Sequence, residues 1–241
     1  MRSPFIAAAI IATLSGSASP LFAMTETKTQ GVATTASPSD AKTCTVSATH
    51  SQAIQARFTK EQAERQAVLA KEDANLAQYR SASDQKLAIH RSGWDTMREA
   101  SFAKLKATPG HYSPAAISTY VASVKAAVSA KRSAEDAETV KVRAQNDQTV
   151  ATRRSTVQQA ISTRNAAVSS AAQAQCGAPF KASVSSARAS FKAADAQALA
   201  TSKTQRQQTA TDRKAQEATI AATFKASVNA ALQALKAAPK A

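Results

Sequence analysis

The chain has 241 residues, of which 59 are alanine and five are glycine, and its formal net charge at pH 7 is +15. No two glycines lie two residues apart, which excludes the Gly-rich loops that nucleotide-binding proteins use to hold phosphate. Aromatic residues make up only 5% of the chain. This composition favours long helices over a sheet with a thick apolar core.

The first 23 residues have the pattern of a secretory signal peptide. Arg2 supplies the positive charge, Phe5–Leu14 is the apolar segment, and small residues lead to a cleavage site after Ala23. The apolar segment is shorter than the about 20 residues that a membrane-spanning helix needs. Residues 24–46 are rich in Thr and Ser and lack an apolar period, so we predict a disordered leader. We therefore expect an exported chain, periplasmic or extracellular, without a transmembrane span.

A unit of eleven residues recurs through the rest of the sequence. The motif FKASV begins one unit at Phe180 and another at Phe224. Eleven residues in three turns is 3.67 residues per turn, so a stripe with this period stays on one side of a nearly straight helix. We expect positions one, five and eight of each unit to form the buried stripe. The second position is lysine in six successive units: Lys181, Lys192, Lys203, Lys214, Lys225 and Lys236.

Two segments interrupt the repeat, and both have the composition of turns. Pro109-Gly110 ends the first repeated stretch, and Cys176-Gly177-Ala178-Pro179 ends the second. The sequence therefore predicts an all-α domain over 47–241, with helices of about 47–107, 115–175 and 180–237. Short connections make consecutive helices antiparallel neighbours, so the expected fold is an elongated, coiled-coil-like bundle with up-down-up topology.

The two cysteines agree with this topology. Folding the first predicted helix back onto the second brings Cys44 and Cys176 to the same end of the bundle. An exported protein meets an oxidising environment, so we predict a disulfide between them. Two free thiols and an intermolecular bridge are the alternatives.

The same antiparallel alignment predicts where large apolar residues gather. Near the first turn, we expect Trp94 to pack beside Val128 and Val228, with Met97 and Val124 close by. Near the second turn, we expect a cluster of Phe58, Ile161, Val168, Phe180 and Phe191. Between them the stripe becomes polar. Either this middle is closed by ion pairs, with Arg80 or Arg91 against Glu135 or Glu138, or the helices separate there.

The sequence contains no recognisable pattern of catalytic, metal-ligating or cofactor-binding residues, so we predict a protein that is not an enzyme and uses no cofactor. The basic residues are the candidate binding groups. The six repeated lysines share one face of the third helix, and the second helix carries Arg132, Arg143 and Arg154 at the same spacing. Such rows attract anionic lipids, glycolipids or wall polymers. The alternative is that they are solvated flanks of the buried stripe. Nucleic acid is a weaker candidate, because no aromatic residues are placed for base stacking.

We predict that the exported bundle is a spacer or binding scaffold of the cell envelope or extracellular space. Two alternatives remain: a binder of anionic surfaces or polymers that uses the lysines, and a chaperone that holds unfolded clients as a trimer or other oligomer. In period, charge and expected compartment, the chain resembles basic helical periplasmic chaperones and proteins with eleven-residue helical repeats that bind lipid surfaces. From the basic rows and the expected compartment, we expect an anionic envelope component or another protein as partner.

Overall fold

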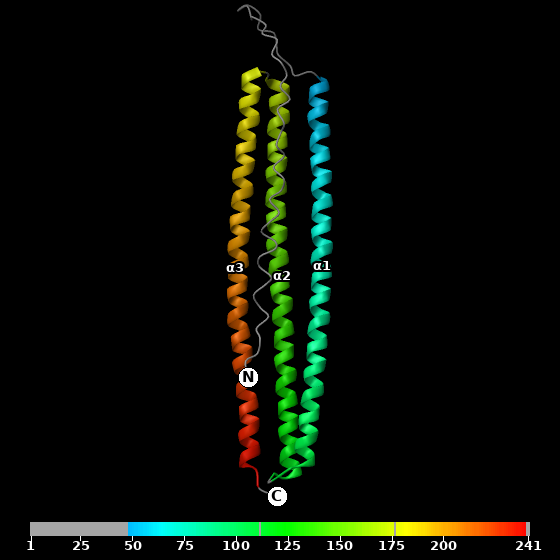
Figure 1. Ribbon diagram of the computed structural model, residues 1–241. Helices are drawn as coiled ribbons and strands as arrows, with labels where there is room; N and C mark the ends of the chain where they lie inside the picture. The colour runs from blue at the N-terminus through cyan, green and yellow to red at the C-terminus, as the bar shows by residue number, and fades with distance from the viewer. Residues whose placement is uncertain (1–47, 111, 176, 240–241) are drawn as a thin grey trace, which may run out of the picture. The chain divides into compact units, whose positions relative to one another are not determined.

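A computed structural model of the chain describes residues 48–110, 112–175 and 177–239. These residues form three long helices, α1 (Ala48–Ala107), α2 (Pro114–Ala174) and α3 (Gly177–Ala237). The helices run side by side, with α2 antiparallel to the other two (Figure 1). The predicted all-α, up-down-up fold is therefore confirmed. The predicted signal peptide and leader, and the proposed bridge between Cys44 and Cys176, lie outside the described residues.

The turn between α1 and α2 is built from the residues that the sequence provides for it. Gly110 has a φ of 62°, a left-handed conformation that glycine adopts without strain. Ser113 is the N-cap of α2, because its Oγ accepts a hydrogen bond from the backbone N–H of Ala116 at 3.2 Å. Pro114 follows at the first helical position, where its missing N–H costs nothing. The turn thus ends one helix and starts the next.

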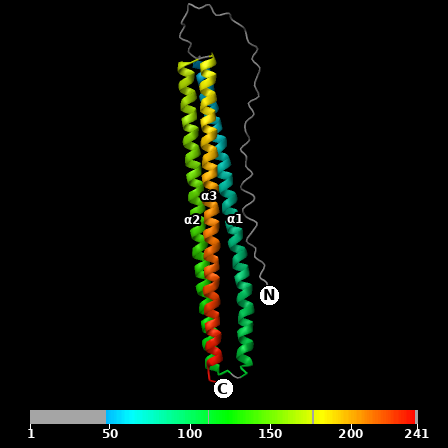
Figure 2. The same cartoon turned by 90° about the vertical axis from the view of Figure 1, so that its left-hand side faces the viewer.

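α2 and α3 form the closely packed pair of the domain (Figure 2). The buried side chains of α3 recur at steps of eleven residues, and most are small enough for the two helices to approach closely. Polar residues also occupy this interface, where Ser202 of α3 and Thr149 of α2 are buried. The buried series along α3 consists of Ala187, Ala198, Thr209, Ile220 and Ala231.

α1 is more loosely attached than α3. Among its described residues only Phe102 is buried, and every residue from 81 to 90 is exposed. α1 approaches α2 at few backbone positions and α3 at none. In Figure 2, α1 diverges from α2 and α3 toward the turn that joins it to α2. The stability of α1 in the domain therefore depends on side-chain contacts with α2 more than on a shared apolar core.

The main apolar cluster lies near the turn between α1 and α2, and its membership corrects one expectation. Trp94 and Met97 are 62% and 54% exposed, so the predicted packing of Trp94 against Val128 and Val228 is wrong. The prediction assumed that all three helices touch at this level, whereas α1 and α3 stay apart. Phe102 takes the place expected for Trp94. The buried members of the cluster are Phe102, Ile117, Val121, Val124, Ala231 and Leu235.

A second, smaller cluster lies toward the turn between α2 and α3. Val157 and Ile161 of α2 pack there against Ala198 of α3, with Phe191 at the margin. Val168, also predicted for this end, is buried. Phe180 makes an edge-on contact with His50, with ring centroids 6.3 Å apart. Within the described ranges, no helix has the apolar length that crossing a membrane requires.

Candidate functional site

Two rows of basic side chains were expected to bind anions, and the structure places them in different environments. The arginines of α2 face α1, where each meets a carboxylate. Arg132, for example, donates from Nη1 and Nη2 to the two oxygens of Asp95, at 2.8 and 2.7 Å. Arg143 binds Asp84 in the same way, at 3.0 and 2.5 Å. Arg154 completes the row with Asp73, at 3.0 and 2.8 Å.

Two further ion pairs have the opposite polarity, with the arginine on α1. Arg80 binds both oxygens of Asp147, at 3.0 and 2.6 Å, and Arg91 binds both oxygens of Asp136, at 3.0 and 2.7 Å. Together the five pairs form an alternating series that we call the charge ladder. Its members are Asp73–Arg154, Arg80–Asp147, Asp84–Arg143, Arg91–Asp136 and Asp95–Arg132.

The ladder follows from the eleven-residue spacing. Along α1 the aspartates recur at 73, 84 and 95, and along α2 the arginines recur at 132, 143 and 154. Because α1 and α2 are antiparallel, each step forward on one helix matches an equal step back on the other. Both partners therefore stay level over the whole ladder. The five two-point pairs arise because Asp and Arg each recur at eleven-residue steps on both helices.

The ladder perturbs the acidity of its carboxylates but is open to solvent. Hydrogen bonds from Arg91 hold the pKa of Asp136 below its usual value, and Arg80 lowers the pKa of Asp147 in the same way. The side chain of Asp147 is nevertheless 50% exposed, and that of Asp136 is 54% exposed. Exposed pairs of this kind contribute about 0.2–1 kcal/mol each, and salt weakens them.

Arg164 connects all three helices near the opposite end from Phe102. Its guanidinium donates to both oxygens of Glu61 on α1, at 3.0 and 2.8 Å. The same group lies 5.8 Å from the ring centroid of Phe58 on α1 and 5.2 Å from that of Phe191 on α3. These cation–π contacts explain how the predicted aromatic cluster forms without direct packing of α1 on α3. α1 is thus anchored near both ends and held by ion pairs between them.

Ion pairs join α1 and α2 across the polar middle of the bundle, which agrees with the first of the two alternatives given for this region. Arg91 Nη2 lies 3.6 Å from Glu135 Oε2, so that expected pair is present. Glu138 is not a partner of α1. It is buried on α2, where Oε2 lies 3.4 Å from Lys141 Nζ and Oε1 has no hydrogen-bond partner among the described residues. Sequence reasoning missed the aspartates of the ladder, although their eleven-residue spacing was the available signal.

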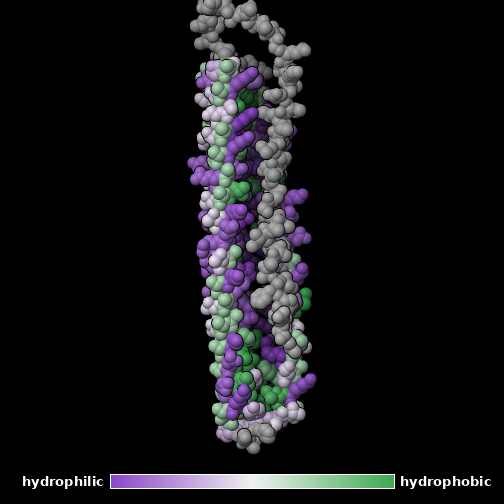
Figure 3. Space-filling view, turned by 60° about the vertical axis from the view of Figure 1, so that its left-hand side comes forward, coloured by the Kyte–Doolittle hydropathy of each residue, from purple (hydrophilic) through white to green (hydrophobic). Residues whose placement is uncertain are grey.

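The six repeated lysines of α3 differ from the arginines of α2. All six side chains belong to exposed residues, and none forms an ion pair with another described residue. Their eleven-residue spacing places successive ammonium groups roughly 16 Å apart along a helix. Figure 3 shows hydrophilic residues along the length of the domain, with hydrophobic ones gathered near the turn between α1 and α2. The row therefore presents uncompensated positive charge to solvent.

Comparison with protein-family models, with curated proteins and with solved structures found no match to this chain. The interpretation of the two basic rows therefore depends on the positions of their side chains in this structure. One is neutralised inside the molecule by α1, and the other is available for an external anion.

Proposed function

We propose that this chain is an exported, non-enzymatic helical scaffold that binds anionic polymers or surfaces through the lysines of α3. The observation that carries the proposal is the contrast between the two rows. The arginines of α2 form ion pairs with carboxylates of α1, whereas the lysines of α3 have no ion-pair partner among the described residues. Residues 178–241 contain ten Lys and Arg against three Asp and Glu.

The spacing of the lysines suits an extended partner. Six positions at roughly 16 Å intervals cover about 80 Å along one helix. A small ligand would meet only one or two of them, but a polymer or surface with many anionic groups would meet all six. Each lysine near an anionic surface contributes about 1 kcal/mol, and the contributions accumulate when one partner engages several of them. Phosphate and carboxylate groups are the shared chemistry of such partners.

A charge-matched comparison tests this proposal. One variant carries Lys192→Gln, Lys203→Gln, Lys214→Gln and Lys225→Gln, and the control carries Lys71→Gln, Lys86→Gln, Lys104→Gln and Lys106→Gln on α1. Both sets are exposed and remove four charges. Binding is measured to long-chain polyphosphate and to vesicles of phosphatidylglycerol with phosphatidylcholine. We expect the α3 variant to lose roughly tenfold or more in affinity, and the control to lose much less.

Equal losses in the two variants would show that only net charge matters, and would contradict a site on α3. The two probes separate polymer from lipid, because a vesicle also requires that α3 lie along a flat surface. Binding by the intact chain should weaken steeply as salt is raised, since exposed charges are screened within about 10 Å at 0.1 M.

A chaperone that holds unfolded proteins is the second candidate, because α1 exposes large apolar residues. Tyr79, Leu87, Trp94 and Met97 are 41–62% exposed and lie on one side of the helix. A surface of this kind suits transient contact with unfolded chains. If this surface binds unfolded chains, the double variant Trp94→Ser with Met97→Ser will suppress client aggregation less than the unchanged protein does. The matched control, with equally apolar and exposed positions elsewhere, is Ile89→Ser with Val140→Ser.

A further inference from the structure

The Asp95 position of the charge ladder has more positive charge than the other positions. Asp95 Oδ1 accepts a hydrogen bond from Arg132 Nη2 at 2.7 Å and a second from Arg98 Nη2. Two guanidinium groups therefore share one carboxylate here. The Asp73 position shows the opposite ratio, because Arg154 meets both Asp73 and Glu72. The two-to-one ratio at Asp95 leaves a positive charge without a full partner.

Arg98 is the group whose hydrogen-bonding capacity is unused. Its side chain is 22% exposed, and its only hydrogen bond in the described part of the chain is the one from Nη2 to Asp95. Nε is buried and has no partner among the described residues. A guanidinium has five N–H donors, and the two on Arg98 Nη1 make no hydrogen bond to another described residue, so they remain available to an acceptor.

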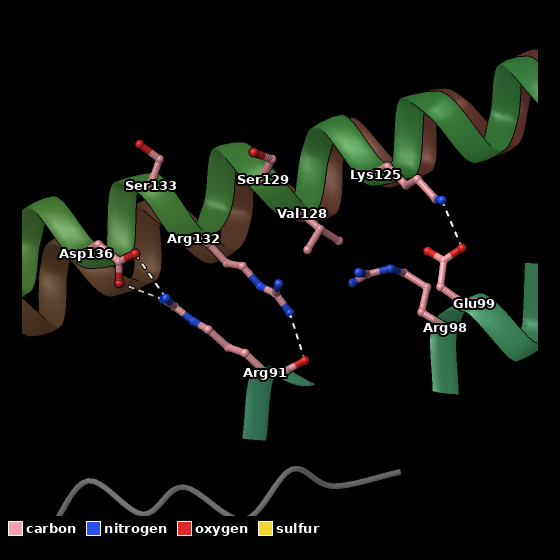
Figure 4. Close-up of a pocket in the computed structure, with 9 residues that line it drawn as sticks. All are labelled: Arg91, Arg98, Glu99, Lys125, Val128, Ser129, Arg132, Ser133 and Asp136. Atoms are coloured by element: carbon pink, nitrogen blue, oxygen red, sulfur yellow. Dashed lines mark hydrogen bonds and ion pairs between the residues drawn. The ribbon is translucent and has the colours of Figure 1, made fainter. Parts of the chain in front are cut away.

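Arg98 projects into an open cavity of about 610 Å³ between α1 and α2. Figure 4 shows its guanidinium between Val128 and the pair formed by Lys125 and Glu99, with Arg132 approaching from the other side. Four cations line this space against two carboxylates. Just outside the lining, Asp95 and Glu135 add two negative charges and Lys131, 3.0 Å from Glu135, adds one positive charge, so the group keeps one excess positive charge. The charged residues that line it are Arg91, Arg98, Lys125, Arg132, Glu99 and Asp136.

We propose that this cavity binds an oxyanion of the phosphate class, with Arg98 as the ligand. Arg132 and Lys125, which are paired with Asp95 and Glu99, lie beside it and add positive potential. A tetrahedral oxyanion offers several acceptors to the planar donors of arginine, and phosphate and carboxylate are the groups that guanidinium binds in two-point geometry. This site lies on α1 and α2, so it goes beyond the proposed function and does not require the lysines of α3.

The experiment uses the full chain with the four α3 lysines replaced by glutamine, so that the proposed lysine row does not contribute. Trp94 directly precedes Asp95 and is the one tryptophan of the sequence, which makes its fluorescence a local reporter. Inorganic pyrophosphate is titrated, and calorimetry checks the affinity. We expect Arg98→Gln to weaken binding about tenfold, the usual loss for a hydrogen bond to a charged group. Arg57→Gln, which removes the same charge from a distant exposed position of α1, should change it less than about twofold.

Asp95→Asn provides a test that depends on the sign of the effect. If the cavity binds oxyanions, loss of the competing carboxylate will tighten pyrophosphate binding, provided that circular dichroism shows the helices intact. Replacing pyrophosphate by dihexanoyl phosphatidate distinguishes a free phosphate from a lipid headgroup. Absence of binding by both probes, equal losses for the two arginine variants, or weaker binding by the folded Asp95→Asn protein would each overturn the proposal.

Discussion

Arg91 of α1 and Asp136 of α2 form a two-point ion pair at 3.0 and 2.7 Å, and Arg80 and Asp147 form the same pair one repeat away. A slip of one residue between the helices would break both pairs, but a slip of eleven would form equivalent ones. The ladder alone therefore selects a set of registers. Phe102 at one end and Phe58, which lies against Arg164, at the other distinguish the correct member of that set, because the residues one repeat away toward the ladder are Arg91 and Leu69.

The pairing of Arg91 with Asp136 can be tested by exchanging the charges. Arg91→Asp alone places like charges opposite each other, and so does Asp136→Arg, so each should lower the free energy of unfolding by about 1 kcal/mol. The double variant restores opposite charges and should recover most of the loss. Chemical denaturation of the four proteins measures this coupling. If the two single effects simply add in the double variant, the pair makes no net contribution to stability.

Acid should release α1 from α2. The pKa values of Asp73, Asp84 and Asp95 are lowered, mainly by hydrogen bonds from Arg154, Arg143 and Arg132. A carboxylate whose pKa is lower in the folded state stabilises the protein above its unfolded pKa of about 3.9, and that contribution is lost as pH falls through the folded value. We therefore expect the ladder segment of α1, residues 73–95, to stay beside α2 from neutral pH down to about pH 4 and to separate below it, while Phe102 still holds one end of the helix.

Spin labels on exposed positions measure this separation directly. Ser83→Cys on α1 and Ala144→Cys on α2, in a background with Cys44 and Cys176 replaced by serine, provide the pair. The distance between labels should lengthen or broaden below about pH 4, and also at high salt at neutral pH. A distance that remains constant through both titrations would show that the ladder does not hold the middle of α1 beside α2.

Phe102 should matter to stability far more than Trp94, although both are aromatic residues of α1. Phe102 is 7% exposed inside the main cluster, whereas Trp94 is 62% exposed. Phe102→Ala is expected to cost about 3 kcal/mol, because it leaves a cavity between the helices. Trp94→Ala should change stability by less than about 0.5 kcal/mol. Thermal unfolding of both variants decides this, and a larger loss for Trp94 would contradict the observed packing.

Glu138→Leu should stabilise the domain. Glu138 is 8% exposed, and its Oε1 has no hydrogen-bond partner among the described residues. Replacing a buried, incompletely paired carboxylate by an apolar side chain of similar size is often favourable, here by roughly 1 kcal/mol. Glu99→Leu is the matched control, because Glu99 is exposed and pairs with Lys125 at 2.9 Å. A lower melting temperature for Glu138→Leu would mean that the carboxylate has an essential partner.

The helix bounds could be predicted because they depend on local signals. A helix cannot continue through Gly110 and Gly177, whose φ is positive, and Pro114 stands at the first position of α2. The repeat also predicts which residues of α3 are buried, since Ala187 and Ile220 occupy the eighth position of their units. These features depend on residues close together in the chain, where spacing determines geometry.

The role of the α2 arginines could not be predicted in the same way. Arg143 and Lys203 each belong to a basic row with the same period, but only the arginine has an aspartate level with it on a neighbouring helix. That difference depends on the antiparallel register, which requires both helices at once. The exposure of Trp94 has a similar origin, because it follows from the distance between α1 and α3.

Covalent labelling of lysines tests whether the α3 row binds a polyanion. The intact chain is treated with an amine-reactive reagent, with and without long-chain polyphosphate, and modification is quantified at each lysine by mass spectrometry. We expect protection of the α3 row, strongest at its central members Lys203 and Lys214, while Lys71 and Lys86 of α1 label at unchanged rates. Uniform protection of both helices, or protection confined to α1, would contradict a binding row on α3.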